Sequence, residues 1–147
     1  MKTASLAALL TLTLLAASVE IIPAAGSGMF KTVQGSVFIL RGENTLPATP
    51  GMEISSGDVV RTAAKSNAGL SFTDGTCLSL GEKSELRIKE YLYAPREDQC
   101  AFDVFMQQGT LAYSSGKLGK AHPEKVHIAT PQTTVGVRGT TFVIKVD

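Results

Sequence analysis

The feature that most constrains the fold is a run of alternating residues around an Asp-Gly pair, between Asn67 and Leu80. Apolar side chains occupy every second position on both sides of this pair, at Ala68, Leu70, Phe72, Leu78 and Leu80. A period of two places such residues on one face of a β-strand. Asp-Gly pairs favour tight hairpin turns in which both central residues have positive φ angles. The sequence therefore predicts a β-hairpin with Asp74 and Gly75 at its turn.

Short apolar or alternating segments of the same kind follow one another along most of the chain. They cover 36–40, 54–62, 86–88, 100–106, 110–113 and 126–130. We expect a loose lead-in at 27–34, a connector at 41–51 and an exposed loop at 114–125. No segment beyond the N-terminal region shows the periodicity of an amphipathic helix. Strands with turn signals every 8–12 residues or so predict an all-β domain, either a short-stranded sandwich, a barrel or a solenoid-like stack.

The segment from Thr130 to Ile144, TPQTTVGVRGTTFVI, has the most unusual composition of these strands. Two apolar stretches flank Arg138 and Gly139, which predicts two short strands around a bend or bulge that the glycine permits. An arginine among apolar neighbours needs a carboxylate or several carbonyls. Asp58 and Asp74 are the candidates for a structural ion pair. In the alternative interpretation, Arg138 binds a carboxylate or phosphate of a partner.

Residues 1–26 have the organisation of a secretory signal peptide. Lys2 provides the positive charge, Leu6–Ala17 the apolar region, and small residues near Ser18 and Gly26 provide two alternative cleavage sites. The alternative is an uncleaved membrane anchor, but the apolar run ends at Glu20 and is short for a bilayer span. We expect a periplasmic or secreted protein with no membrane insertion after cleavage.

Export changes the interpretation of the two cysteines, Cys77 and Cys100. In an oxidising compartment, a cysteine pair in a small domain is more often joined than free. A disulfide between them would stabilise the domain by about 2–4 kcal/mol. Two buried free thiols are the alternative.

Charge and composition exclude several function classes. The chain has 14 basic and 13 acidic residues and a formal charge of +1, with the basic residues scattered, which argues against nucleic acid as a partner. His122 and His127 are interpreted as solvated side chains, and Glu85, Arg87 and Lys89 as the outward face of a strand. Neither a metal or cofactor site nor a convergent catalytic set is found, so we do not expect an enzyme.

Four motifs in order carry a resemblance to a known family. They are SGDVVRT, then FTDGTCLSLGEKSEL, then QQGTLAY, then ATPQTTVGVRGTTFVI. Over about residues 33–146 the chain resembles the periplasmic domain of the FecR family, and we expect a FecR-like β domain at 33–147. The resemblance implies a β-rich extracytoplasmic domain that takes part in signalling between an outer-membrane receptor and a cytoplasmic sigma factor. Its signature falls on fold-defining positions: Gly57, Asp58, Thr62, Asp74, Gly75, Gly109, Thr130, Pro131, Val137, Arg138, Gly139, Thr140 and Phe142.

The order of segments differs from that of the family's regulators, which carry a cytoplasmic anti-sigma segment and a membrane helix before this domain. With a signal peptide there instead, we expect a free-standing exported binding module that holds an envelope protein partner, for example by strand addition after Val146. The alternative is a carbohydrate- or cell-wall-binding accessory domain. Stacking on sugars would require exposed aromatics, and the chain has no tryptophan and three tyrosines, Tyr91, Tyr93 and Tyr113.

Overall fold

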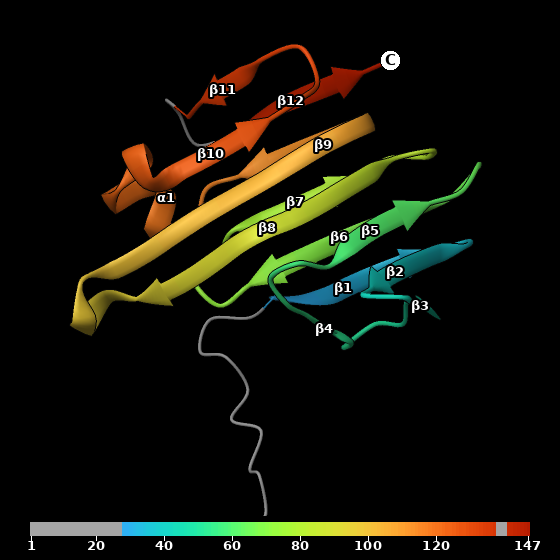
Figure 1. Ribbon diagram of the computed structural model, residues 1–147, viewed down its shortest axis with the longest axis horizontal. Coiled ribbons are helices and arrows are strands. Elements are labelled where there is room, and N and C mark those ends of the chain that lie inside the picture. Colours follow the sequence, from blue (N-terminus) through green and yellow to red (C-terminus); the bar gives the residue numbers. More distant parts are fainter. Residues whose placement is uncertain (1–27, 138–140) are drawn as a thin grey trace, which may run out of the picture.

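The computed structural model describes residues 28–137 and 141–147, and its all-β fold confirms the predicted class (Figure 1). Two sheets lie face to face and share one long strand, so that together they form a single curled sheet. Sheet A contains β1 (Gly28–Gln34), β4 (Glu53–Ile54), β6 (Asn67–Phe72), β7 (Cys77–Leu80), the end of β9 (Gln99–Ser114) and β12 (Thr141–Val146). Sheet B contains β2 (Val37–Arg41), β3 (Asn44–Pro47), β5 (Val59–Thr62), β8 (Glu85–Ala94), the start of β9, β10 (Val126–Ala129) and β11 (Thr134–Gly136).

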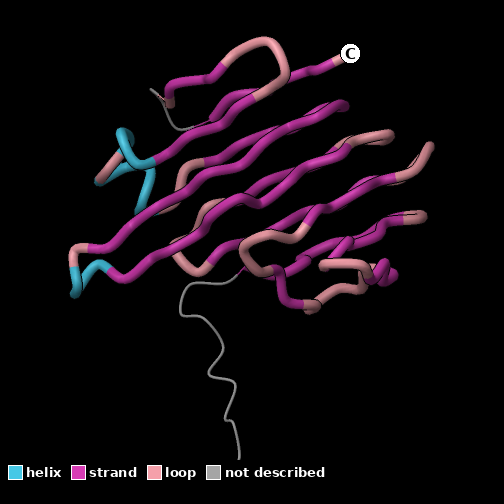
Figure 2. The backbone as a smooth tube through the Cα atoms, in the orientation of Figure 1, coloured by secondary structure: helices cyan, strands magenta, loops and turns pink. Residues whose placement is uncertain are grey.

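Helical structure is confined to short segments at one end of the sandwich, as Figure 2 shows. They are α1 (Lys117–Ala121) and two 3₁₀ turns, η1 (Pro95–Glu97) and η2 (Pro123–Lys125). None of the helices in the described part of the chain is both long enough and apolar enough to span a bilayer.

The core lies between the two sheets and is built by the predicted alternation. In β6 and β7 the residues Ala68, Leu70, Phe72, Leu78 and Leu80 are all buried, as the hairpin pattern predicts. Four aromatic rings, those of Phe72, Tyr91, Phe102 and Tyr113, form a contiguous cluster with neighbouring centroids 4.7–6.0 Å apart. Large rings in tilted and edge-to-face contact give this small domain much of its buried apolar surface.

Strand β9 joins the two sheets because it is long enough to belong to both. Its first part pairs with β8 on one side and, in parallel, with β10 on the other. Its last part pairs with β7 and β12. The change of sheet occurs at Gly109, whose φ is +98°, and a Cβ there would overlap the backbone and side chain of Ser84. Only glycine fits both the angle and the space.

Three other crossings between the sheets, those of β1 to β2, β5 to β6 and β7 to β8, are joined by hydrogen bonds to one another or to the crossing within β9. Ser66 Oγ accepts from the Ser36 N–H at 2.9 Å, joining the β1–β2 crossing to the β5–β6 crossing. Thr62 Oγ1 accepts from the Ser84 N–H at 2.9 Å, and Ser84 Oγ accepts from the Thr110 N–H at 3.1 Å. Small hydroxyl side chains thus satisfy backbone donors that the sheet ladders lose where the chain turns.

Three segments that the sequence predicts to be irregular contain regular structure, so those predictions are wrong in part. The lead-in at 27–34 contains β1, whose Phe30 is fully buried, and the connector at 41–51 contains β3. The loop at 114–125 contains α1, with Leu118 buried in the core. In each case pairing or packing with distant residues orders a segment whose own sequence gives little signal.

The hairpin turn also differs from the expected type. Gly75 has φ of +91°, but Asp74 does not have a positive φ. The Gly75 N–H donates to the Phe72 carbonyl at 2.9 Å, and the Phe72 N–H to the Thr76 carbonyl at 2.9 Å. This is a type I turn followed by a glycine bulge, which needs one positive φ angle where the expected turn needs two.

The predicted disulfide is absent, and both cysteines are free thiols. Cys77 alternates with buried Leu78 in sheet A and therefore faces away from the core. Cys100 lies in the part of β9 that belongs to sheet B and packs against the core. A disulfide needs two Cβ atoms directed toward each other. Cys77 on the outer face of sheet A and Cys100 on the inner face of sheet B do not meet this condition.

Candidate functional site

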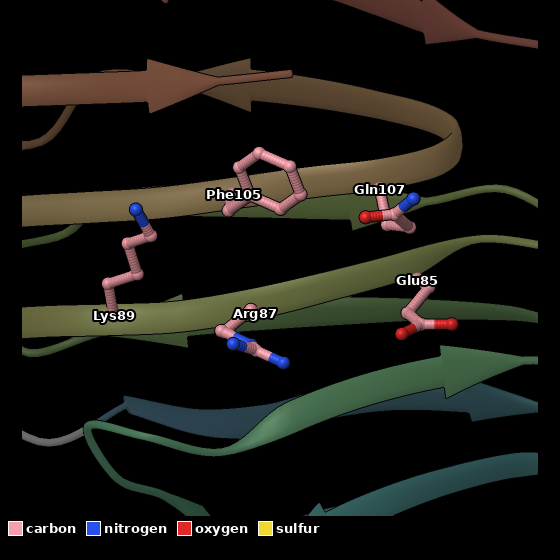
Figure 3. Close-up of a pocket in the computed structure, with 5 residues that line it drawn as sticks. All are labelled: Glu85, Arg87, Lys89, Phe105 and Gln107. Carbon is pink, nitrogen blue, oxygen red and sulfur yellow. The ribbon is translucent and has the colours of Figure 1, made fainter. Parts of the chain in front are cut away.

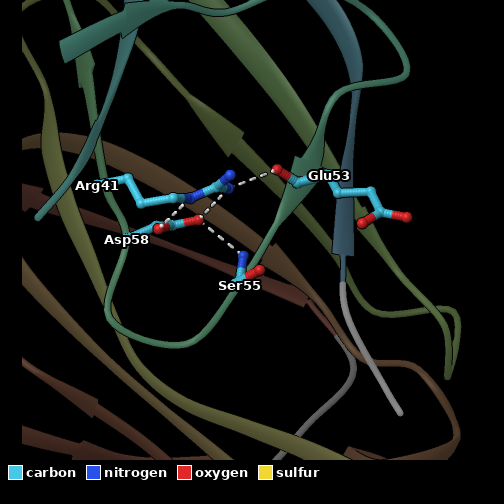
Figure 4. A network of polar contacts seen from close by, with 4 residues as sticks. All are labelled: Arg41, Glu53, Ser55 and Asp58. Carbon is cyan, nitrogen blue, oxygen red and sulfur yellow. Dashed lines mark hydrogen bonds and ion pairs between the residues drawn. The ribbon is translucent and has the colours of Figure 1, made fainter. Parts of the chain in front are cut away.

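A buried aspartate anchors the turn before β5, in the network drawn in Figure 4. The Asp58 side chain is 2 % exposed, and Arg41 from β2 donates to it twice, from Nε at 3.0 Å and Nη2 at 2.8 Å. The Ser55 N–H also donates to Asp58 at 2.8 Å. Hydrogen bonding to Asp58 raises the pKa of Arg41. The described partner of Asp58 is therefore Arg41, whereas the sequence favours an ion pair of Asp58 or Asp74 with Arg138.

The second predicted carboxylate, Asp74, is held by neutral donors. Its Oδ1 accepts from the Tyr91 hydroxyl at 2.9 Å and the Thr76 N–H at 3.2 Å. Its Oδ2 accepts from the Thr76 hydroxyl at 2.7 Å and the Leu118 N–H at 3.1 Å. The Asp74 carbonyl also accepts from the Lys117 N–H at 2.8 Å. Asp74 thus connects the β6–β7 turn, β8 and the first turn of α1, where a carboxylate is favourable.

Of the remaining signature residues, Thr130 and Pro131 lie where the chain turns between β10 and β11, and Phe142 lies within β12. Arg138, Gly139 and Thr140 fall outside the described residues, so the role expected for Arg138 stays a prediction. Thr130 is buried and closes the β10–β11 hairpin, since its Oγ1 accepts from the Thr133 N–H at 3.1 Å, while neighbouring Pro131 is exposed. β11 belongs to sheet B and β12 to sheet A.

The histidines and tyrosines offer little chemistry at the surface. His127 is exposed, as expected for an outward-facing side chain, and His122 contacts Glu124 at 3.3 Å. Tyr91 and Tyr113 are buried, and burial raises the pKa of both hydroxyls. No group of His, Cys, Asp and Glu side chains among residues 28–137 and 141–147 is arranged to hold a metal ion. With two of three tyrosines inside the core, the surface for stacking on sugars is smaller than the composition suggests.

The edge formed by β12 is the most regular free strand in the structure. β12 pairs with β9 through six consecutive antiparallel residues without a bulge, and in the described part of the chain no strand pairs with its other side. Its side chains alternate between half-buried Phe142 and Ile144 and exposed residues such as Val143, which is 66 % exposed. Phe142 stacks on Tyr113 with ring centroids 4.9 Å apart, which ties this strand to the core.

The free edges of β3, β4 and β11 are protected in ways that β12 is not, and the part of β1 beyond β4 is interrupted by a shift in register between Phe30 and Thr32. β4 has only two residues, β3 ends in Pro47, and β11 has three residues including Gly136. Short strands and proline are the devices by which natural sheets avoid pairing with other chains. β12 has six residues, and none of them is proline or glycine. The sequence predicts strand addition after Val146, but it does not indicate how this edge differs from the others.

A recess on the outer face of sheet B is a feature that sequence analysis missed (Figure 3). It has a volume of about 280 Å³ and is lined by Glu85, Arg87 and Lys89 of β8 and by Phe105 and Gln107 of β9. The Lys89 ammonium lies 5.6 Å from the centre of the Phe105 ring. The alternation of β8 predicts that these charges face water, but only the pairing of β8 with β9 places Phe105 beside them.

Comparison with known proteins finds one family. The family model described as FecR protein matches residues 58–147. No curated protein and no solved structure matches the chain. The matched residues begin at the Asp58 anchor and include β5 to β12, with the Asp74 network and the β12 edge. Because this match covers more than half of the sequence, the chain belongs to the FecR protein family.

Proposed function

We propose that this protein is an exported, non-enzymatic binding module that holds a protein of the cell envelope by pairing with it along β12. The FecR family is associated with signalling, and FecR domains are typically periplasmic in envelope signalling proteins. Membership therefore favours a role in signalling or assembly over catalysis. The expected signal peptide at 1–26, outside the described residues, would bring the domain to the same compartment.

The observation that carries this proposal is the contrast between β12 and the other edges. A strand with free backbone N–H and C=O groups binds an extended segment through main-chain hydrogen bonds, while side chains on alternate positions give specificity. β12 presents six such residues, and its contact with β9 and Tyr113 holds the strand in place before a partner arrives. A preorganised edge reduces the entropy lost on binding.

The test is a crosslinking pull-down from the cell envelope with three tagged baits, the unaltered domain, Val143→Pro and Ile144→Pro. In an antiparallel edge strand, the N–H groups of successive residues point alternately to the neighbouring strand and outward. One of the two prolines therefore breaks the pairing with β9, and the other removes a donor from the free edge alone. Circular dichroism and thermal unfolding identify the variant that folds normally.

The expected result is an envelope protein captured by the unaltered domain and lost with the folded proline variant. Equal capture by the unaltered domain and by the folded proline variant would refute strand addition along β12. An Arg138→Ala bait tests separately the expected role of that arginine at an interface. Capture of no protein, together with retention of the domain on insoluble peptidoglycan, would favour the carbohydrate-binding alternative.

A further inference from the structure

The outer face of sheet B carries two cations, Arg87 and Lys89, that are not paired with a carboxylate of the described residues. Arg61 forms an ion pair with Glu85 at 3.3 Å. In the described part of the chain, Arg87 and Lys89 form no ion pair. Both are exposed, and both line the recess at the junction of β8 and β9 (Figure 3).

Apolar side chains lie directly beside these cations. Arg87 is the cross-strand partner of Val59 on one side and of Phe105 on the other. The same row continues to Leu40 on β2 and to Ala129 on β10. These four apolar residues are half-buried, so each leaves part of its surface in contact with water. A partner that covers this row would bury apolar surface and at the same time meet the two charges.

We propose that this face of sheet B binds an extended acidic segment of the partner protein, with carboxylates at alternate positions. Arg87 and Lys89 are two residues apart on β8, which corresponds to about 7 Å in an extended strand. Side chains two residues apart in an extended peptide have the same spacing and point to the same side. One carboxylate reaches the Arg87 guanidinium and the next reaches Lys89, and the intervening residue passes beside Phe105. A segment that continues past Arg87 toward Glu85 passes near Gln107, whose amide donates and accepts hydrogen bonds (Figure 3).

Acidic groups around the recess favour a discrete peptide over a continuous anionic surface. Glu90 and Asp103 are cross-strand partners just beyond Lys89, and Glu85 lies at the opposite end of the recess. A membrane or a nucleic acid would bring its negative charges against these carboxylates as well as against the two cations. A peptide with two suitably spaced carboxylates meets the cations only. This inference rests on the proposed function, since it describes the partner, but it uses a surface other than β12.

The test is an NMR titration of the ¹⁵N-labelled domain with the peptide acetyl-Glu-Val-Glu-Val-Glu-amide. The matched peptide with Gln in place of each Glu has the same length and apolar content without the charges. We expect saturable shifts centred on Arg87, Lys89 and Phe105, and a weaker effect at higher salt. The double variant Arg87→Gln/Lys89→Gln should weaken binding roughly tenfold, because it removes both charges that meet the carboxylates and exposed ion pairs are individually weak.

The control variants are Arg61→Gln on the same face and Lys31→Gln on β1 in the other sheet. Each removes one positive charge and should change binding by less than about twofold. Equal binding of the Gln peptide, an equal loss with the controls, or no saturable shift would overturn the proposal. Binding to phosphatidylglycerol vesicles that depends on Arg87, without peptide binding, would overturn it in favour of a membrane. If the peptide fails while the β12 pull-down still captures its partner, only this inference fails.

Discussion

The Asp74 network allows a sharp prediction, that Asp74→Asn destabilises the domain although the two side chains have the same shape. Each carboxylate oxygen accepts one backbone N–H, that of Thr76 at Oδ1 and that of Leu118 at Oδ2. Whichever oxygen becomes the amide NH₂, one of these buried N–H groups then faces another donor. A flip of the amide exchanges the two positions and does not remove the conflict.

The magnitude follows from this geometry. A buried donor left without a partner costs about 1–3 kcal/mol, and the remaining bonds lose the assistance of the charge. The Tyr91 hydroxyl can turn toward Thr73 Oγ1, 3.1 Å away, so this donor need not be lost. We therefore expect the free energy of unfolding to fall by about 2–3 kcal/mol, a large fraction of the stability of a small domain.

Urea unfolding measures the change, and hydrogen exchange locates it. The amides of Lys117 and Leu118 should exchange faster in Asp74→Asn than in the unaltered protein, since α1 loses its anchor. Asp103→Asn is the matched control, because Asp103 is half-exposed and accepts no hydrogen bond from a buried backbone N–H in the described part of the chain. Its effect should be within about 0.5 kcal/mol. An effect equally small for Asp74→Asn would refute the reasoning.

Three further predictions concern stability. Arg41→Gln should lower the free energy of unfolding by about 1–3 kcal/mol in urea, because buried Asp58 loses two charged hydrogen bonds; no change would mean that water replaces the guanidinium. Gly109→Ala should cost about 3 kcal/mol or more, because a Cβ overlaps Ser84 at a positive φ angle, and a normal melting temperature would contradict this close approach. Burial raises the pKa of the Tyr91 hydroxyl in the folded protein, so this hydroxyl loses its proton at a lower pH in the unfolded chain than in the folded one. The free energy of unfolding should therefore fall as pH rises above about 10. Urea midpoints measured across alkaline pH should fall less steeply in Tyr91→Phe.

Elements with a strong local pattern could be predicted from the sequence. The β6–β7 hairpin has both the alternation and the Asp-Gly turn, and it forms where predicted. β1 could not be identified, because a shift in register between Phe30 and Thr32 interrupts its alternation. α1 could not be identified either, because a helix of five residues has little intrinsic stability and depends on Asp74, more than forty residues earlier.

The candidate sites show the same division between local and long-range information. The sequence indicates that Arg87 and Lys89 face water, because β8 alternates. It does not indicate that Phe105 lies beside them, because a bulge between Ile88 and Glu90 sets that register. The ion pair of Arg41 and Asp58 forms because β2 pairs with β5. This pairing joins strands that are not consecutive in the chain, and no local pattern in the sequence indicates it.

The pairing of β1 and β2 with later strands has a consequence for where this domain can be cut. A chain shortened to begin at Asp58, where the family match starts, would keep β5 and β6 but remove β2 and β1, the strands that cover one side of each. It would also remove Phe30, Val37 and Ile39 from the core and Arg41 from its aspartate. Both sheets would then end in bare, regular strands, which invite pairing between molecules. Such a fragment should aggregate or form oligomers that the full domain does not, whereas a fragment that begins at Gly28 keeps β5 and β6 covered.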